Sequence, residues 1–125
     1  MKQILCFGDS NTRGLDGETG KRFSWEERWT GILQEKLADR DIRIVEEGLC
    51  GRTTIFEDPL RLGRRGTELL PTLLETHTPD AVVLMLGTND CKTIFGASAE
   101  IILKGNARIQ EKINKNEEKK KVLVK

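Results

Sequence analysis

The chain has 125 residues, which is enough for one small domain spanning residues 1–125 and too few for two. Its 37% hydrophobic and 33% charged residues are typical of a water-soluble globular protein and exclude a disordered or fibrous chain. The 21 basic and 20 acidic residues nearly balance, so we expect neither a nucleic acid nor a membrane surface as partner.

The cysteines and the N-terminal residues indicate the compartment. The 3 cysteines are odd in number and show no CxxC spacing, which argues against a disulfide framework or a zinc site. Gly8 and Asp9 end a run of only four apolar residues, so these residues do not form a signal peptide. No apolar stretch is long enough for a membrane span. We therefore expect a protein of the reducing cytoplasm.

The spacing of apolar residues predicts alternating strands and helices. Short apolar runs predict strands at Ile4–Phe7, Ile42–Glu46, Ala81–Leu86 and Val122–Val124. Helical spacing predicts three helices, one capped by Ser24 and Glu27 and running to Leu37, one carrying Leu69 to Leu74, and one over Ser98–Asn114. The order β, α, β, α, β, α, β predicts an α/β fold, a parallel sheet in a three-layer sandwich with right-handed crossovers.

The segments between these elements complete the prediction. Residues Thr12 to Phe23 read as a loop, Trp25 and Trp29 as core residues on one helix face, and NKNEEKKK as a charged turn. The strand at Ile42–Glu46 has one wetter face and is expected near a sheet edge, whereas Ala81–Leu86 is expected to be central. The chain ends at KVLVK, inside the fourth strand, so we expect a truncated product that self-associates through an exposed edge.

Three polar clusters follow the first three predicted strands. They are Gly8-Asp9-Ser10-Asn11, Gly48-Leu49-Cys50-Gly51-Arg52 and Gly87-Thr88-Asn89-Asp90. The carboxyl ends of parallel strands share one edge of a sheet, and function gathers there. Each cluster alone is usually a turn or a helix cap. Their occurrence in order on one edge is what favours a site.

The residue types in these clusters suit acyl-transfer chemistry. Ser10 follows a strand directly, where its hydroxyl can be exposed and backbone N–H groups point outward. The backbone N–H of Gly51 and the carboxamide of Asn89 add two further donors. Together these groups could form an oxyanion hole beside a serine nucleophile.

The sequences FGDSNTRG, EEGLCGRTT and MLGTND resemble the first three blocks of the SGNH (GDSL) hydrolase superfamily, and closely its bacterial arylesterase and acyltransferase subgroup. The resemblance covers nearly the whole chain. It implies a flavodoxin-like fold, Ser10 as nucleophile, and Ser10 N–H, Gly51 N–H and Asn89 as oxyanion donors. It also implies that Asp9 braces the serine turn and that Asp90 supports the loop after Asn89. Members of the subgroup act on small acyl esters without a metal or other cofactor and are often oligomeric.

The family's late DxxH segment, whose histidine is the general base, is missing from this sequence. A serine hydroxyl without an adjacent base is a weak nucleophile. His77 is the only histidine. It precedes the third strand whereas Asn89 follows it, so we expect roughly 20 Å between them, and we read His77 as a surface or loop residue.

The leading hypothesis is thus the N-terminal part of a GDSL-type serine esterase. One alternative is a non-catalytic remnant that binds acyl or sugar esters, and another is a module that binds phosphate at the GDSN turn. Arg13, Arg52 and Trp25 are candidates for lining an acyl pocket, because they lie close to the blocks. Cys50 and Cys91 are near the edge residues as well, but small cysteines are more often structural.

Overall fold

The computed structural model describes residues 1–116 and 121–124 and contains a parallel sheet. Its strands are β1 (Lys2–Gly8), β2 (Ile42–Gly48), β3 (Ala81–Met85) and β4 (Lys121–Val124), arranged in the order β2-β1-β3-β4. This is the order of flavodoxin-like sheets as far as the fourth strand. All four predicted strands are therefore confirmed, and β2 lies at an edge as expected. Residues 117–120 of the predicted charged turn lie outside the described residues.

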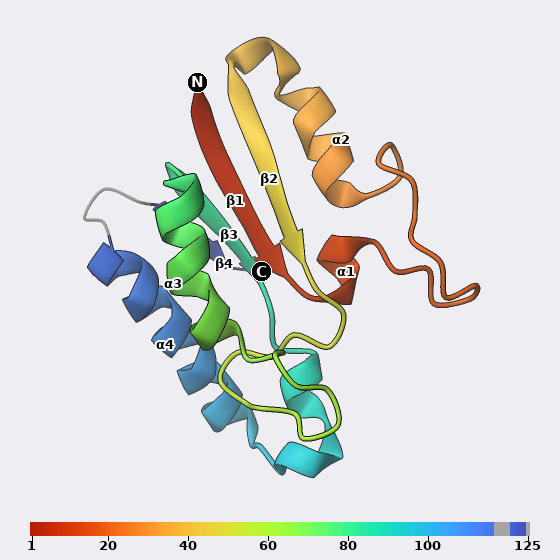
Figure 1. Ribbon diagram of the computed structural model, residues 1–125, viewed down its shortest axis with the longest axis vertical. Helices are drawn as coiled ribbons and strands as arrows, with labels where there is room; N and C mark the ends of the chain where they lie inside the picture. The colour runs from red at the N-terminus through yellow and green to blue at the C-terminus, as the bar shows by residue number, and fades with distance from the viewer. Residues whose placement is uncertain (117–120, 125) are drawn as a thin grey trace.

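The helices cover both faces of the sheet. Figure 1 shows α2 (Trp29–Lys36) beside one face, and α3 (Gly66–His77) with α4 (Ala99–Asn116) on the other. Within β1, Leu5 and Phe7 pack with α3 and α4, whereas Cys6 between them packs toward α2. This alternation is the period of a strand buried on both faces. The predicted three-layer α/β/α sandwich is confirmed.

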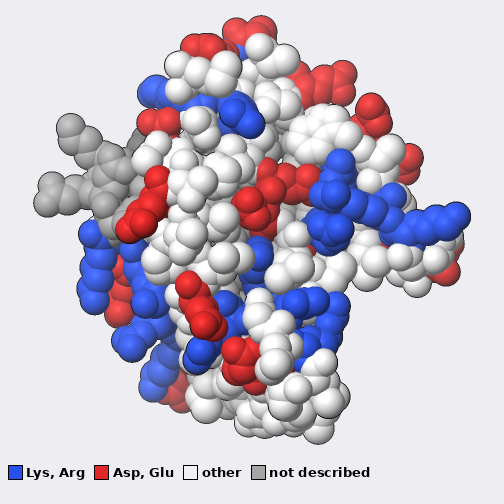
Figure 2. All heavy atoms as spheres, in the orientation of Figure 1, with Lys and Arg blue, Asp and Glu red and all other residues white. Residues whose placement is uncertain are grey.

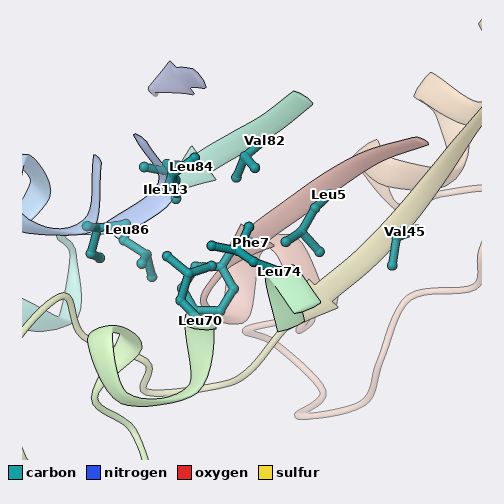
Figure 3. Packing of buried hydrophobic residues seen from close by; sticks show 10 residues of the cluster. Leu5, Phe7, Val45, Leu70, Leu74, Val82, Leu84, Leu86 and Ile113 are labelled. Atoms are coloured by element: carbon teal, nitrogen blue, oxygen red, sulfur yellow. The ribbon is translucent and has the colours of Figure 1, made fainter. Parts of the chain in front are cut away.

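The larger of two hydrophobic cores lies between the sheet and the pair α3 and α4 (Figure 3). Leu70 and Leu74, one helical turn apart on α3, are fully buried there, as are Ile109 and Ile113 of α4. The smaller core is formed under α2 by Cys6, Ile44 and Val83, with Ile4, Trp29, Leu33 and Leu37 packed against it.

The register brings the ends of three strands to one edge. Gly8, the last residue of β1, is paired with Gly48 of β2 on one side and with Met85 of β3 on the other. The loops that follow these strands therefore begin side by side. This confirms that the three polar clusters share one edge of the sheet.

Helix α2 begins later than predicted. Ser24 and Glu27 do not cap it, because the hydroxyl of Ser24 donates to the Glu27 carboxylate at 3.1 Å and the helix starts at Trp29. The chain at Trp25 lies against Gly31 inside the helix, where a Cβ atom would overlap the Trp25 carbonyl group. Residues 25–28 therefore form a turn beside the helix and cannot extend it.

This turn also separates the two tryptophans. Trp29 packs against the smaller core, as predicted. Trp25 lies outside both cores and its ring faces the guanidinium of Arg28 at 5.1 Å, so the prediction that it is a core residue was wrong.

Four short helical segments were not predicted. They are α1 (Ser10–Arg13), η1 (Ala38–Arg40), η2 (Asn89–Cys91) and η3 (Thr93–Phe95). Each has only 3 or 4 residues, which is too short for a helical repeat of apolar residues to be visible. Helix α1 occupies the start of the segment predicted as a loop from Thr12.

Replacing Leu70 with alanine is expected to lower the free energy of unfolding by about 3 kcal/mol, because this side chain is fully buried in the larger core. The matched control is Leu60→Ala, since Leu60 is 85% exposed, and we expect a change below about 0.5 kcal/mol. Urea denaturation followed by circular dichroism measures both variants. Equal losses would contradict the packing described here.

Candidate active site

The turn after β1 is built around the one-turn helix α1. Asp9 caps its N-terminus, where Oδ1 accepts the backbone N–H of Asn11 at 3.1 Å. Gly14 ends the helix in the left-handed region, with φ 89°, and its N–H donates to the Ser10 carbonyl at 2.9 Å. Both ends of the helix are thus specified locally, and Ser10 becomes its first residue.

Two glycines let α1 lie directly on the strand ends. A Cβ atom on Gly8 would overlap the Thr12 hydroxyl and lie 3.0 Å from the Met85 carbonyl oxygen. A Cβ atom on Gly48 would overlap the Arg13 backbone nitrogen and lie 2.7 Å from its Cα. Because backbone atoms cannot move aside as a side chain can, these glycines hold the serine turn at the edge of the sheet.

The hydroxyl and the backbone N–H of Ser10 are both available. Ser10 is half-buried, and its hydroxyl makes no hydrogen bond to any residue that the structure describes. Its N–H, at the first position of α1, likewise has no acceptor in the described ranges. A carbonyl group of a ligand could therefore meet a hydroxyl group and an N–H donor on the same residue.

Gly51 lies in the loop after β2 with φ 81°, in the left-handed region. Its N–H has no acceptor among residues 1–116 and 121–124. A Cβ atom here would lie 2.7 Å from Nη1 of Arg61, so the backbone conformation and the neighbouring guanidinium both favour glycine. The Gly51 N–H is thus free to donate to a ligand.

Arg52 connects the strand ends. Its side chain is 3% exposed, and Nη1 donates to the carbonyl oxygens of Glu47 at 2.7 Å and Gly8 at 3.2 Å. Its guanidinium also lies 4.2 Å from the centre of the Phe7 ring. Burial lowers the pKa of Arg52 to about 10. The expectation that Arg52 lines an acyl pocket was wrong, because its charge is used to bind backbone carbonyls.

The loop after β3 is joined to the loop after β2 by two side chains. The carboxamide of Asn89 donates to the Arg52 carbonyl oxygen at 3.0 Å. Asp90 is fully buried, and its carboxylate accepts the backbone N–H of Thr54 at 2.9 Å as well as the Thr54 hydroxyl. Asp90 therefore anchors the loop that carries Asn89.

Arg52 thus links all three clusters, through its side chain to Gly8 and through its carbonyl to Asn89. The structure brings Ser10, Gly51 and Asn89 to one edge of the sheet, with Asp9 and Asp90 beneath them as buried side chains. Sequence reasoning missed the anchoring partner Thr54. The signal was its place in the block EEGLCGRTT, two residues after Arg52.

Burial raises the pKa of both buried carboxyl groups. For Asp9, the loss of solvent outweighs the Asn11 N–H and the nearby charge of Arg52, which favour the carboxylate. For Asp90, it outweighs the two hydrogen bonds from Thr54. These carboxyl groups are held in place by hydrogen bonds at an electrostatic cost.

His77 is the last residue of α3. Its Nε2 lies 3.6 Å from Oε1 of Glu47, and its side chain is 27% exposed. It is therefore a partly exposed residue at a helix end, which agrees with the reading of a surface histidine and not with that of a loop histidine. No hydrogen bond or ion pair connects it to Ser10 in the described part of the chain.

The remaining candidates lie as follows. Arg13 is exposed at the end of α1, and Trp25 pairs with Arg28. Cys50 is half-buried and Cys91 is exposed. Within the described residues, no three His, Cys, Asp or Glu side chains are grouped as metal ligands. None of the described helices is both long and apolar enough to cross a bilayer.

Arg52→Ala is expected to lower the free energy of unfolding by about 3 kcal/mol, since it removes a buried side chain whose guanidinium donates to the carbonyl oxygens of Glu47 and Gly8, the latter keeping the Leu49 N–H at 3.2 Å. Arg40→Ala, at an exposed arginine of η1, serves as control with an expected change below about 0.5 kcal/mol. Denaturant titration of the two variants beside the wild type measures the difference. A loss no larger than that of the control would refute the linking role.

The raised pKa of Asp90 predicts a pH effect. The folded state binds the proton more tightly than the unfolded state, so the stability contributed by Asp90 falls as pH rises from 3.8 through the raised pKa. The free energy of unfolding of the wild type, minus that of Asp90→Asn, should decrease over this range. Below pH 3.8, Asp16→Asn should give the opposite slope, because the Glu18 N–H lowers the pKa of Asp16. Denaturation at several pH values tests both signs, and parallel profiles for wild type and Asp90→Asn would exclude the effect.

Comparison with known proteins identifies a matching family and a related esterase. A family model described as GDSL-like lipase/acylhydrolase matches residues 6–124. The chain is 30% identical over 91 residues to an arylesterase of Vibrio mimicus, a match that covers 71% of this chain and 38% of that protein.

Two solved structures are similar over nearly the whole chain. The aryl esterase of M. smegmatis has a TM-score of 0.92 at 38% identity, covering 99% of this chain and 63% of that chain. A carbohydrate acetylesterase family member from Sinorhizobium meliloti has a TM-score of 0.92 at 39% identity, covering 99% and 62%. The chain thus spans less than two thirds of the length of each of these relatives. Because the family model matches residues 6–124, and the two solved structures share the fold, this chain belongs to the GDSL-like lipase/acylhydrolase family.

Proposed function

We propose that Ser10 is the nucleophile of an esterase site that cleaves small acyl esters through an acyl-enzyme. The observation that carries this proposal is the unbonded hydroxyl of Ser10 at the first position of α1, on the edge shared with Gly51 and Asn89. Family membership supports it, as do relatives described as an aryl esterase and a carbohydrate acetylesterase. Aryl and carbohydrate acetates are accordingly the first substrates to consider.

The chemistry assigned to each residue follows from its contacts. Ser10 Oγ would attack the acyl carbon, and negative charge would develop on the carbonyl oxygen. The N–H groups of Ser10 and Gly51 are unoccupied, and the Asn89 carboxamide has a second N–H beyond the one bonded to Arg52. Donors of this kind are typically worth about 3 kcal/mol each at the transition state. The ester C–O bond would then break, and the alcohol would leave with the proton lost by the Ser10 hydroxyl. Water or another alcohol would take the acyl group from Ser10 and restore its hydroxyl.

The proton of the Ser10 hydroxyl needs a base. His77 is the only histidine of the chain, and its Nε2 lies beside Glu47. We therefore expect these 125 residues by themselves to turn over esters slowly. The position of His77 also favours the second candidate function, in which the site binds acyl or sugar esters without cleaving them.

No cofactor enters this proposal, and a small acyl ester is the proposed ligand. The three cysteines are free thiols, on which we base the proposal of a reducing, cytoplasmic location. Association of several copies, as in members of the subgroup, is likewise a proposal.

Hydrolysis of p-nitrophenyl acetate by the wild type should exceed background, and Ser10→Ala should abolish the excess. Ser24→Ala is the matched control, because Ser24 is exposed and its hydroxyl is bonded to the Glu27 carboxylate. It should behave as the wild type. Mass spectrometry of the intact protein after mixing should show one added acetyl group in the wild type and none in Ser10→Ala. Background rates and no acetylation in all three proteins would reject the nucleophile and leave the binding alternative.

A further inference from the structure

Arg61 is placed over one of the proposed oxyanion donors. It lies in the loop between β2 and α3, and its Nη1 is 2.7 Å from the position that a Gly51 Cβ atom would take. Its own N–H donates to the Asp58 carbonyl oxygen at 3.1 Å, in the turn that carries it. The guanidinium is thus held against the backbone of Gly51 and is exposed to solvent.

The charge of Arg61 has no carboxylate partner within 4.0 Å in the part of the chain that the structure describes. Asp58 is the acidic residue nearest in sequence, but its two oxygens are occupied. Oδ2 pairs with Lys92 at 3.0 Å, and Oδ1 accepts the Leu60 N–H at 2.9 Å. The Leu60 N–H and, to a smaller extent, the charge of Arg61 lower the pKa of Asp58, but the guanidinium makes no hydrogen bond to a described residue, so its donors remain free for another acceptor.

The neighbouring arginine increases the positive charge. Arg64 Nε donates to the Cys50 carbonyl oxygen at 2.8 Å, and Nη1 donates to the Leu62 carbonyl oxygen at 3.2 Å, so it binds no carboxylate either. Several basic side chains elsewhere lie within 4.0 Å of a carboxylate, and Figure 2 shows the two kinds interspersed over much of one face. Arg28 with Glu46 and Arg65 with Glu68 are examples.

We propose that Arg61 is a specificity-determining residue that binds a carboxylate group on the ester substrate. The inference rests on the proposed function, which places the Gly51 N–H at the reacting carbonyl group. A guanidinium offers a planar pair of donors that matches a carboxylate, and it stays charged at any physiological pH. A substrate with its ester carbonyl at Gly51 and a carboxylate within reach of Arg61 would satisfy both.

Binding to the Ser10→Ala variant tests this without turnover. The ligands are 4-acetoxybenzoate and its uncharged methyl ester, with dissociation constants from NMR titration at constant ionic strength. We expect the carboxylate to bind about tenfold more tightly than the methyl ester. A second pair puts the charge on the acyl side, as the 4-nitrophenyl monoester of adipic acid against the same compound with its acid methylated.

Arg61→Gln, in the same background, should reduce the preference to about onefold while leaving the affinity for the methyl ester unchanged. Arg61→Lys should retain part of it. Arg40→Gln removes the same charge from the exposed segment η1 before β2, and this variant should retain the full preference for the carboxylate. A preference in either pair that depends on Arg61 supports the proposal and shows on which side of the ester the carboxylate lies.

The proposal is overturned if neither pair shows a preference that depends on Arg61, if none of the four esters binds, or if Arg61→Gln weakens charged and neutral esters equally. These outcomes are independent of catalysis. A chain that fails to hydrolyse p-nitrophenyl acetate can still show the Arg61-dependent preference, and a chain that hydrolyses it can lack that preference.

Discussion

The arrangement of the site depends on the buried guanidinium of Arg52. Parallel strands end with carbonyl groups that point beyond the sheet, and those of Glu47 and Gly8 are covered by the loop after β2. A single side chain satisfies both oxygens while lying on the ring of Phe7 in the larger core. Removing this charge from water is costly, and the reduced pKa reflects the cost. The hydrogen bonds and the ring contact offset it.

The glycines of the site act through their lack of a side chain. Gly8 and Gly48 permit α1 to rest on the ends of β1 and β2, and Gly51 permits a guanidinium to lie on its Cα. A side chain at any of these positions would push a functional group away from the edge of the sheet. The polar motifs are therefore requirements of close packing as much as of chemistry, because the nucleophile and the donors must lie within one substrate's reach.

The sequence predicted the elements with strong apolar signals and the edge they share. The run Ala81–Leu86 corresponds to β3 at Ala81–Met85, and helical spacing over Ser98–Asn114 corresponds to α4. It did not predict that residues 25–28 turn beside α2, because this depends on the contact of Trp25 with Gly31. Such a contact between separate segments leaves no periodic trace.

Some site residues could be predicted from sequence patterns, and others depend on contacts between separate segments. Ser10, Gly51 and Asn89 could be placed from their positions after strands, since the register of a parallel sheet then fixes their neighbourhood. The burial of Arg52 and the hydrogen bond between Asp90 and Thr54 could not be predicted, because arginine and threonine side chains in a loop are usually solvated. Their roles depend on which loop covers which strand end.

The hydrogen bonds that assemble the edge join three pairs of residues that lie far apart in the chain. Thr54 and Asp90 are separated by 36 positions, Arg52 and Asn89 by 37, and Gly8 and Arg52 by 44. Each closes a long loop, whose entropic cost must be met before the bond contributes. None can persist in a chain in which β1, β2 and β3 are not yet aligned. The edge therefore forms late in folding and is lost as soon as the sheet opens. The arrangement of the site thus lasts only as long as β1, β2 and β3 stay aligned.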